Sequence, residues 1–386
     1  MEEESRGIKI FHFADTHLGF SAYRKLDHDG VNQREKDVYN AFTTIVDYII
    51  KSKPDLVIHA GDLFDSVRPT NRAISVALEQ LLRLSKARIP TIVLSGNHET
   101  PKLRETGHIF QLFDHLEYIY PVYSDKEETH YFDVNGKTVV VHAVPHCREQ
   151  KNFLNALRRV APDNSADYNI LTTHGAVQSV QEFRMNEFNE YLIPLSTLLK
   201  GFDYVALGHY HRHVVIRENI VYSGSVEKLS FLEAGDQKGA AEVSFTPLYS
   251  ISFLPFPTRT MVDLEPINCG SLSLDEIIER IKKISAETES KDAIVRLSLL
   301  NIDTATYRTL DISFIKSLFS QSFHFEMRHT TTGELDDTAA SPVTAIGDLL
   351  TEFEKFMEKS SCKNKAVILA LGKRYIQQAQ TEQEET

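Results

Sequence analysis

Side chains that can bind metal ions follow five separate apolar runs of this 386-residue chain. Each run has the length of a short buried strand, and a glycine lies beside or shortly after the polar residues that follow it. In an open α/β sheet, ligands bind beyond the carboxyl ends of the strands, so residues far apart in sequence can meet there. The candidate metal ligands are Asp15, His17, Asp62, Asn97, His174, His209 and His211.

These seven side chains offer oxygen and nitrogen donors without a thiolate. Such a set suits manganese, iron or zinc better than copper(I) or an iron–sulfur cluster. It exceeds what one tetrahedral ion needs and fits two ions, with the Asp62 carboxylate as the bridge. Asp15 and His17 alternate along an extended segment, so both can face one ion. Two ions about 3.5 to 4 Å apart can activate water and neutralise a phosphoryl oxygen, which points to phosphoester hydrolysis.

His98 follows Asn97 and is predicted to play a different part. An imidazole beside a metal pair can donate a proton to a leaving oxygen or stabilise the charge that develops on the phosphoryl group. Each short motif alone is weak, because a lone Asp-x-His or His-x-His is more often a hydrogen-bonded surface pair; their joint occurrence favours a metal centre. Four other histidines lack the glycine turns, so we expect them to be packed rather than ligating: His12, His59, His142 and His213.

The order of the elements predicts an α/β fold with a mixed β core flanked by helices. Residues 8–13, 35–51 and 56–60 form a β-α-β unit, in which Lys53-Pro54 ends the helix. A helix from residue 71 and a strand at 91–94 follow, and Pro101 opens a further helical stretch through Leu116. Asn135-Gly136 is a two-residue hairpin signal, which marks a change to antiparallel pairing.

Pro255-Phe256-Pro257 divides the chain, since two prolines in three residues interrupt both helix and sheet pairing. We expect a first domain over residues 1–256, a small α+β accessory domain over 257–329 and a polar linker over 330–341. Residues 342–386 are expected to form a C-terminal helix pair with one apolar stripe on each helix. An apolar stripe beyond a linker favours a partner surface over packing back on the body.

The net charge of -12 argues against a protein that coats polyanions, although a local basic rim can still bind a phosphate backbone. Arg24, Lys25 and Arg68 are the candidate phosphate contacts; solvated loop charges explain them nearly as well. No apolar run reaches the roughly 20 residues of a membrane helix, and the first residues lack a signal-peptide pattern. We therefore expect a cytoplasmic protein, nucleoid-associated in a prokaryote, with no membrane partner. The three scattered cysteines predict reduced thiols.

The order Asp-x-His, Gly-Asp-x-x-Asp, Gly-Asn-His-Glu, His-Gly and Gly-His-x-His resembles the calcineurin-like metallophosphoesterases. Residues 15–19, 61–65 with Arg68-Pro69, and 208–211 are similar more narrowly to the Mre-eleven and SbcD branch, the nucleases of DNA double-strand-break repair. The resemblance covers nearly the whole chain. It implies a β-sandwich core in αββα layers, a small α+β capping domain that contacts DNA, and a C-terminal helix pair.

The same resemblance implies a manganese-dependent DNA nuclease, acting as a 3′-to-5′ exonuclease and as an endonuclease on single strands and hairpins. Of the two Mn²⁺ ions per chain, one would be held by Asp15, His17, Asp62 and His211. The other would be held by Asp62, Asn97, His174 and His209, with His98 as the catalytic histidine. The resemblance further implies a homodimer with contacts near residues 71–85 and 105–116. It also implies that residues 342–386 bind a coiled-coil ABC-type ATPase.

Asp65 departs from many archaeal and eukaryotic members of the branch, which carry a histidine there, and matches the bacterial members. Asp65 is therefore a candidate secondary active-site residue. Because a carboxylate cannot donate a proton as an imidazolium does, the balance between exonuclease and endonuclease activity stays open.

Two other functions stay open. A phosphatase or small-molecule phosphodiesterase would need the same ligands, and a DNA-end tethering scaffold would carry a secondary metal site. The accessory domain and tail favour the nuclease over the small-substrate enzyme, and the full set of donors argues against the scaffold.

Overall fold

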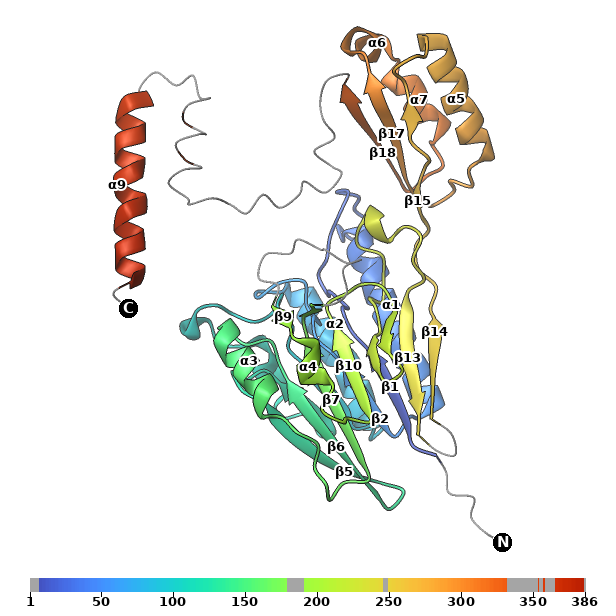
Figure 1. The fold of residues 1–386 in the computed structure, drawn as a ribbon. Helices are drawn as coiled ribbons and strands as arrows, with labels where there is room; N and C mark the ends of the chain where they lie inside the picture. Colours follow the sequence, from blue (N-terminus) through green and yellow to red (C-terminus); the bar gives the residue numbers. More distant parts are fainter. Residues whose placement is uncertain are drawn as a thin grey trace. The chain divides into compact units, whose positions relative to one another are not determined.

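The computed structural model describes residues 7–178, 191–245, 249–331, 353, 357 and 365–384. Its first sheet has the order β14-β13-β1-β2-β3-β4 (Figure 1). Strands β1 to β4 pair in parallel, whereas β13 pairs antiparallel with both β1 and β14. The strands are β1 (Lys9–Phe13), β2 (Leu56–His59), β3 (Thr91–Leu94), β4 (Ile119–Val122), β13 (Gly239–Ser244) and β14 (Ser250–Pro255).

The second sheet has the order β11-β12-β10-β7-β6-β5. Its central strands β6, β7, β10 and β12 are parallel, and the two edge strands are antiparallel to their neighbours. A separate two-stranded sheet pairs β8 (Ala176–Val177) with β9 (Leu192–Ile193). The six strands are β5 (Glu128–Val134), β6 (Lys137–Val144), β7 (Tyr168–His174), β10 (Tyr204–Gly208), β11 (Val214–Arg217) and β12 (Ile220–Tyr222).

One buried apolar cluster joins the two sheets and contains Ile10 and Ile58 of the first sheet with Ile170 of the second. Because successive side chains of a strand point to opposite faces, Phe11 and Phe13 lie on the other face of β1. There they pack against α1 (Gln33–Ser52) and α2 (Asn71–Lys86) in a second cluster. Helices α3 (Gln150–Arg159) and α4 (Leu195–Leu198) pack on the outer face of the second sheet. The α/β fold with αββα layers is therefore confirmed.

The boundaries of α1 follow from local chemistry. The side chain of Asn32 accepts hydrogen bonds from the backbone N–H groups of Arg34 and Glu35, which caps the first turn. Lys53 ends the helix with φ of 48°, in the left-handed region. The hairpin is also confirmed, since Asn135 and Gly136 both have positive φ, at 55° and 75°.

The single helical stretch expected from Pro101 through Leu116 is wrong. Two short 3₁₀ helices occupy this segment, η1 (Arg104–Thr106) and η2 (Ile109–Phe113). Gly107 between them has φ of 69°, and the His108 ring accepts a hydrogen bond from the Phe110 N–H at the start of η2. A left-handed glycine followed by a new cap interrupts an α-helix, so the apolar spacing alone was misleading. A third 3₁₀ turn, η3 (Phe231–Glu233), precedes β13.

The C-terminal part contains a four-stranded sheet in which β17 pairs with β15, β16 and β18. Internal contacts divide the chain into two units, residues 1–265 with 281–297 and 312–327, and residues 266–280 with 298–311 and 328–386. The expected domain limits stay a prediction. The elements are β15 (Met261–Asp263), β16 (Ile267–Asn268), α5 (Leu274–Glu287), β17 (Ile294–Ile302), α6 (Thr304–Thr309), α7 (Ile312–Leu318) and β18 (His324–Thr331).

Strand β18 continues to Thr331, two residues into the expected linker. The second tail helix is present as α9 (Lys365–Glu384), whereas the first, expected over 343–357, lies outside the described residues except for Phe353 and Met357. None of the described helices is both long and apolar enough to cross a bilayer. Cys147 and Cys269 are buried and carry free thiols; Cys362 lies outside the described residues.

Candidate metal centre

The parallel strands bring the candidate ligands to one edge of the two sheets. Because β1 pairs with β2 and β2 with β3 in parallel, the segments that follow these strands leave the first sheet on the same side. The parallel pairing of β7 with β10 places His174 opposite Gly208, so His209 and His211 follow beside it. Four of the candidate ligands have positive φ: Asp15, His17, Asp62 and His209, at 53°, 51°, 55° and 111°. Non-glycine residues rarely adopt this conformation, and its occurrence at a site is typical of functional constraint.

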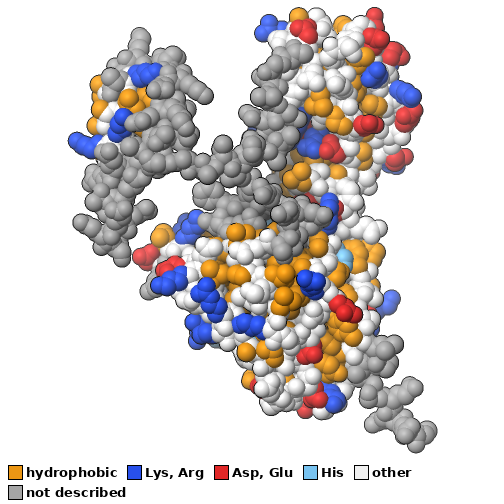
Figure 2. All heavy atoms as spheres, viewed as in Figure 1, with side chains coloured by type: hydrophobic (Ala, Val, Ile, Leu, Met, Phe, Trp, Pro, Cys, Tyr) orange, Lys and Arg blue, Asp and Glu red, His pale blue; other side chains and the backbone are white. Residues whose placement is uncertain are grey.

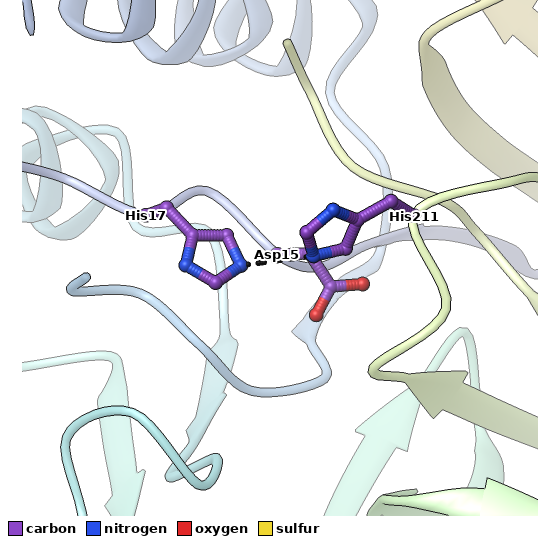
Figure 3. Close-up of side chains that lie close together, drawn as sticks. All are labelled: Asp15, His17 and His211. Carbon is purple, nitrogen blue, oxygen red and sulfur yellow. Dashed lines mark hydrogen bonds between the residues drawn. The ribbon is translucent and has the colours of Figure 1, made fainter. Parts of the chain in front are cut away.

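Asp15, His17 and His211 form the first group of candidate ligands (Figure 3). The Nε2 atoms of the two imidazole rings lie 3.1 Å apart. One ligand atom from each of the three residues lies within 4.8 Å of the others, and all three residues are buried. Two ring nitrogens at this distance need a proton or a cation between them, so the geometry fits a shared metal ion.

Asp15, Asp62 and His174 form a second group within the same 4.8 Å limit. The Nε2 atom of His174 lies 3.2 Å from Asp62 Oδ2 and 2.9 Å from Asn97 Oδ1. Its Nδ1 donates to the carbonyl oxygen of Ala60 at 2.9 Å, which leaves Nε2 of the neutral ring as the ligand atom. His209 extends the group, because its Nδ1 lies 3.3 Å from Asn97 Oδ1.

Asp62 lies between the two groups. Its Oδ2 atom is 3.8 Å from His17 Nε2 in the first group and 3.2 Å from His174 Nε2 in the second. Its other oxygen accepts a hydrogen bond from the His98 N–H at 3.0 Å, which fixes the rotation of the carboxylate. This intermediate position fits the bridging carboxylate expected from the sequence.

Two glycines allow the ligands to approach the backbone closely. A Cβ atom on Gly96 would lie 2.1 Å from Asp62 Oδ1, and one on Gly61 would lie 2.2 Å from His174 Nδ1. Real Cβ atoms do not come this close to other atoms. Glycine is therefore required at both strand exits, and a larger residue at either position would displace a candidate ligand.

The buried carboxylates of the site are stabilised by positive charge nearby. Burial alone would lower the pKa of His174, but Asp62 and Asp15 raise it to about 9. Burial would raise the pKa of the Asp62 carboxyl, yet the neighbouring His174 and His98 hold it well below its usual value. A histidine must lose its ring proton to bind a metal, so a divalent cation can replace the protons that these carboxylates attract. The donor set and its charge thus fit divalent metal ions.

His98 lies at the edge of this centre. Its Nδ1 donates to the carbonyl oxygen of Asp65 at 3.0 Å, and its ring packs edge-on against His17 with centroids 4.6 Å apart. The side chain is 27% exposed, and its Nε2 lies 4.0 Å from Asp62 Oδ2. His98 is therefore accessible to a substrate beside the metal ligands. The Asp65 carboxylate lies 3.3 Å from His17 Nδ1, so Asp65 contacts both histidines.

The three candidate DNA contacts do not share one environment. Arg24, Lys25 and Arg68 are all exposed, and Arg68 lines a cavity of about 520 Å³ together with Glu105. The ammonium group of Lys25 donates to the carbonyl oxygen of Phe323 and lies 4.8 Å from the centre of its ring. Lys25 therefore contacts Phe323 of the same chain, and a contact between Lys25 and a DNA phosphate stays a prediction.

The four histidines expected to be packed have other neighbours. His12 bonds to Tyr204, His59 to Thr16 and His142 to Asn169, at 2.8, 2.8 and 3.1 Å, and His213 stacks on Phe253. Within the described part of the chain, none of the four belongs to a group of side chains that could hold a metal ion.

Three residues of the centre were missed from the sequence. Glu99 Oε1 accepts a hydrogen bond from the Gly96 N–H at 2.8 Å, and burial with the nearby Asp62 charge raises its pKa to about 8. Its place in the Gly-Asn-His-Glu run was the available signal. Glu233 and Lys238 lie behind His211 and have no sequence signal, because only the packing of η3 brings them there.

Comparison with known proteins bears on this centre. The model of the calcineurin-like phosphoesterase family matches residues 8–213, a range that contains all the candidate ligands and His98. The DNA double-strand break repair protein Mre11 of Methanococcus maripaludis is 28% identical over 333 residues, 84% of this chain and 82% of that protein. The Mre11 protein of Sulfurisphaera tokodaii is 28% identical over 295 residues, 74% and 70% of the two chains. That of Saccharolobus solfataricus is 32% identical over 206 residues, 53% and 49%.

Proposed function

Because this chain belongs to the calcineurin-like phosphoesterase family and Mre11 repair proteins are among its relatives, we propose that it is a metal-dependent DNA nuclease. It hydrolyses phosphodiester bonds in the repair of DNA double-strand breaks, as a 3′-to-5′ exonuclease and as an endonuclease on single strands and hairpins. The observation that carries the proposal is the position of Asp62 between two buried groups of oxygen and nitrogen donors. This is the arrangement that a pair of divalent ions requires.

The ligands divide between two ions, which we propose to be Mn²⁺. Asp15, His17, Asp62 and His211 hold one ion. The other is held by Asp62, Asn97, His174 and His209, so that each of the seven candidate ligands binds an ion. When bound, a pair of divalent ions makes water a better nucleophile at neutral pH and offsets negative charge on the phosphoryl group.

His98 supplies the proton for the leaving oxygen. With Nδ1 donating to the Asp65 carbonyl oxygen, the proton available to a substrate is the one on Nε2 of the imidazolium. Its partial exposure supports contact with a phosphodiester that lies over the ligands. Asp65 orients two histidine rings. Its carboxylate lies beside His17 Nδ1, and its carbonyl oxygen accepts a hydrogen bond from His98 Nδ1.

The substrate class rests on the relatives and on the organisation of the chain. We propose a phosphoesterase domain over residues 1–256, a capping domain that contacts DNA over 257–329, a linker over 330–341 and a helix pair over 342–386. Figure 2 shows basic, acidic and apolar side chains interspersed among the described residues of the first unit in view. We propose local DNA contacts by Arg24 and Arg68, whose side chains are exposed.

The proposed partners follow the same relatives. The protein acts as a homodimer, and residues 342–386 bind a coiled-coil ATPase subunit through an apolar helix face. In α9 this face includes Val367, Leu371 and Tyr375, whose side chains are 43% to 60% exposed. A phosphatase or small-molecule phosphodiesterase is the alternative, because the ligands alone do not fix the substrate. A scaffold that only tethers DNA ends would have no use for the complete set of donors.

The test is a cleavage assay with end-labelled DNA duplexes and hairpins, alongside a generic phosphomonoester, each with and without Mn²⁺. We expect manganese-dependent shortening of the DNA and little hydrolysis of the monoester. Hydrolysis of the monoester alone would favour the phosphatase, and binding of DNA without any hydrolysis would favour the scaffold.

A further inference from the structure

The side of His211 that faces away from the candidate metal position contacts a buried carboxylate. His211 Nε2 points toward His17, whereas its Nδ1 lies 3.3 Å from Oε1 of Glu233. Both residues are buried, at 6% and 5% exposure. The pair links β10, after which His211 follows, with η3, which carries Glu233.

The η3 turn holds the Glu233 carboxylate in place. Oε1 accepts hydrogen bonds from the N–H and the hydroxyl of Ser230, at 3.2 and 3.1 Å. Oε2 lies 3.4 Å from the Ser225 hydroxyl and from the Leu229 N–H. The hydrogen bond from the Ser230 N–H is part of a helix capping box. Together these contacts give the carboxylate one fixed orientation before any ion arrives.

Lys238 completes the arrangement. Its ammonium group lies 2.6 Å from Glu233 Oε2 and also donates to the carbonyl oxygen of His211 at 2.6 Å. The side chain of Lys238 is fully buried. A buried ammonium keeps its carboxylate partner ionised, and here it also ties the backbone of His211 to the same pair.

Two of the other ligating histidines, His17 and His174, have different contacts on the side away from the metal position. His17 Nδ1 faces the carboxylate of Asp65, which is 34% exposed, and His174 Nδ1 donates to a backbone carbonyl. Of His17, His174 and His211, only His211 has a buried carboxylate at its non-ligating nitrogen, and that carboxylate is paired with a buried ammonium group. This feature lies outside the short motifs that identify the family.

We propose that Glu233, held by Lys238, is a positioning residue that keeps the proton of the neutral His211 ring on Nδ1 and directs Nε2 at the metal ion. This inference rests on the metal centre of the proposed function. A carboxylate that accepts from the non-ligating nitrogen orients the ring and raises the basicity of the ligating nitrogen, and loss of such a partner typically weakens metal binding about 10- to 100-fold. The effect is confined to the ion that His211 binds.

The test titrates the metal-free full-length protein with MnCl₂ and counts free Mn²⁺ by electron paramagnetic resonance. We expect two ions per wild-type chain. In Glu233→Gln, one of the two binding steps weakens about 10- to 100-fold and the other stays near its wild-type affinity. Glu227→Gln is the matched control, since Glu227 is equally buried in the same segment but its carboxylate faces Arg34 and the backbone of Lys228 and Arg259.

A second measurement needs no change at Glu233. In wild-type protein labelled with ¹⁵N-histidine, the His211 signals are identified by their loss in His211→Gln, and we expect the neutral ring to carry its proton on Nδ1. A proton on Nε2 contradicts the inference. So does a folded Glu233→Gln protein that binds both ions with wild-type affinity, or one weakened no more than Glu227→Gln.

These outcomes separate this inference from the proposed function. Two ions bound without DNA cleavage would contradict the nuclease and leave the role of Glu233 intact. A wild-type chain that binds no ion would contradict both.

Discussion

The Nε2 atoms of His17 and His211 lie 3.1 Å apart, although the two residues are separated by 194 positions. His17 follows β1 of the first sheet and His211 follows β10 of the second, so the contact exists only because the two sheets pack face to face. A hydrogen bond between two ring nitrogens requires a proton on one of them. A metal ion removes that requirement, because both nitrogens can then act as ligands.

Substitution of Asp62 should affect both ions. Asp62→Asn keeps the volume of the side chain but removes the charge that lies between His17 and His174. We expect both Mn²⁺ binding steps to weaken and the rate of DNA cleavage to fall by at least about 100-fold. Asp55→Asn is the control, because Asp55 precedes β2 at its opposite end and binds the Lys9 N–H at 2.8 Å. Loss of only one ion in Asp62→Asn would show that this carboxylate does not bridge.

His98→Ala should separate catalysis from metal binding. The ring of His98 is partly exposed at the edge of the centre, and we assign it proton donation rather than ligation. General acid catalysis contributes roughly 10²- to 10⁴-fold, so we expect a loss of that size in the cleavage rate with two ions still bound. Single-turnover kinetics together with metal counting measures both quantities. Departure of the metal ions along with activity would make His98 a structural residue.

Gly96 should not tolerate a side chain. In Gly96→Ala the new methyl group would overlap Asp62 Oδ1 and the Asp62 backbone nitrogen, at 2.1 and 2.5 Å. We expect the free energy of unfolding to fall by about 2 to 4 kcal/mol and metal binding to weaken, measured by denaturant unfolding and Mn²⁺ titration. Gly235→Ala serves for comparison, because a Cβ atom there meets no heavy atom within 4 Å. Equal stability of the two variants would contradict the close approach.

His12 should make the fold sensitive to acid. Burial, with a smaller effect of His213, lowers the pKa of His12 to about 3 in the folded chain, from 6.5 when it is exposed. Between these values the unfolded chain binds a proton that the folded chain does not, so stability is lost as the pH falls below 6.5. The slope is about 1.4 kcal/mol per pH unit.

The variant His12→Asn isolates this contribution, since its amide does not titrate. The difference in unfolding free energy between wild type and His12→Asn should change by about 2 kcal/mol from about pH 7 to about pH 5. His28→Gln, at an exposed position, should leave the pH profile as it is. A wild-type profile parallel to that of His12→Asn would mean that His12 is protonated inside the fold.

The core fold was predictable because local and long-range signals agree. The apolar spacing of Val38, Phe42 and Ile49 matches the buried face of α1, and Lys53-Pro54 ends it as expected. The candidate ligands were recognisable for the same reason, since each lies where a strand ends. Parallel pairing then brings Asp15, Asp62 and Asn97 to a common edge.

Other features depend on contacts that no local pattern encodes. The 3₁₀ turns of residues 104–113 replace an α-helix because Gly107 takes positive φ and His108 caps η2. The contact between Glu233 and His211 likewise has no signal in the sequence. Glu233 belongs to a short turn, and only the packing of that turn against the segment after β10 gives its carboxylate a ligand to hold.

The most direct test of the metal centre is a crystal structure of the protein grown with manganese, in which anomalous scattering locates each ion. We predict two peaks. The Asp62 carboxylate binds both ions, either through one shared oxygen or with one oxygen on each ion, and His17 and His211 bind the same ion. A single peak, or two ions of which Asp62 binds only one, would contradict the bridged pair.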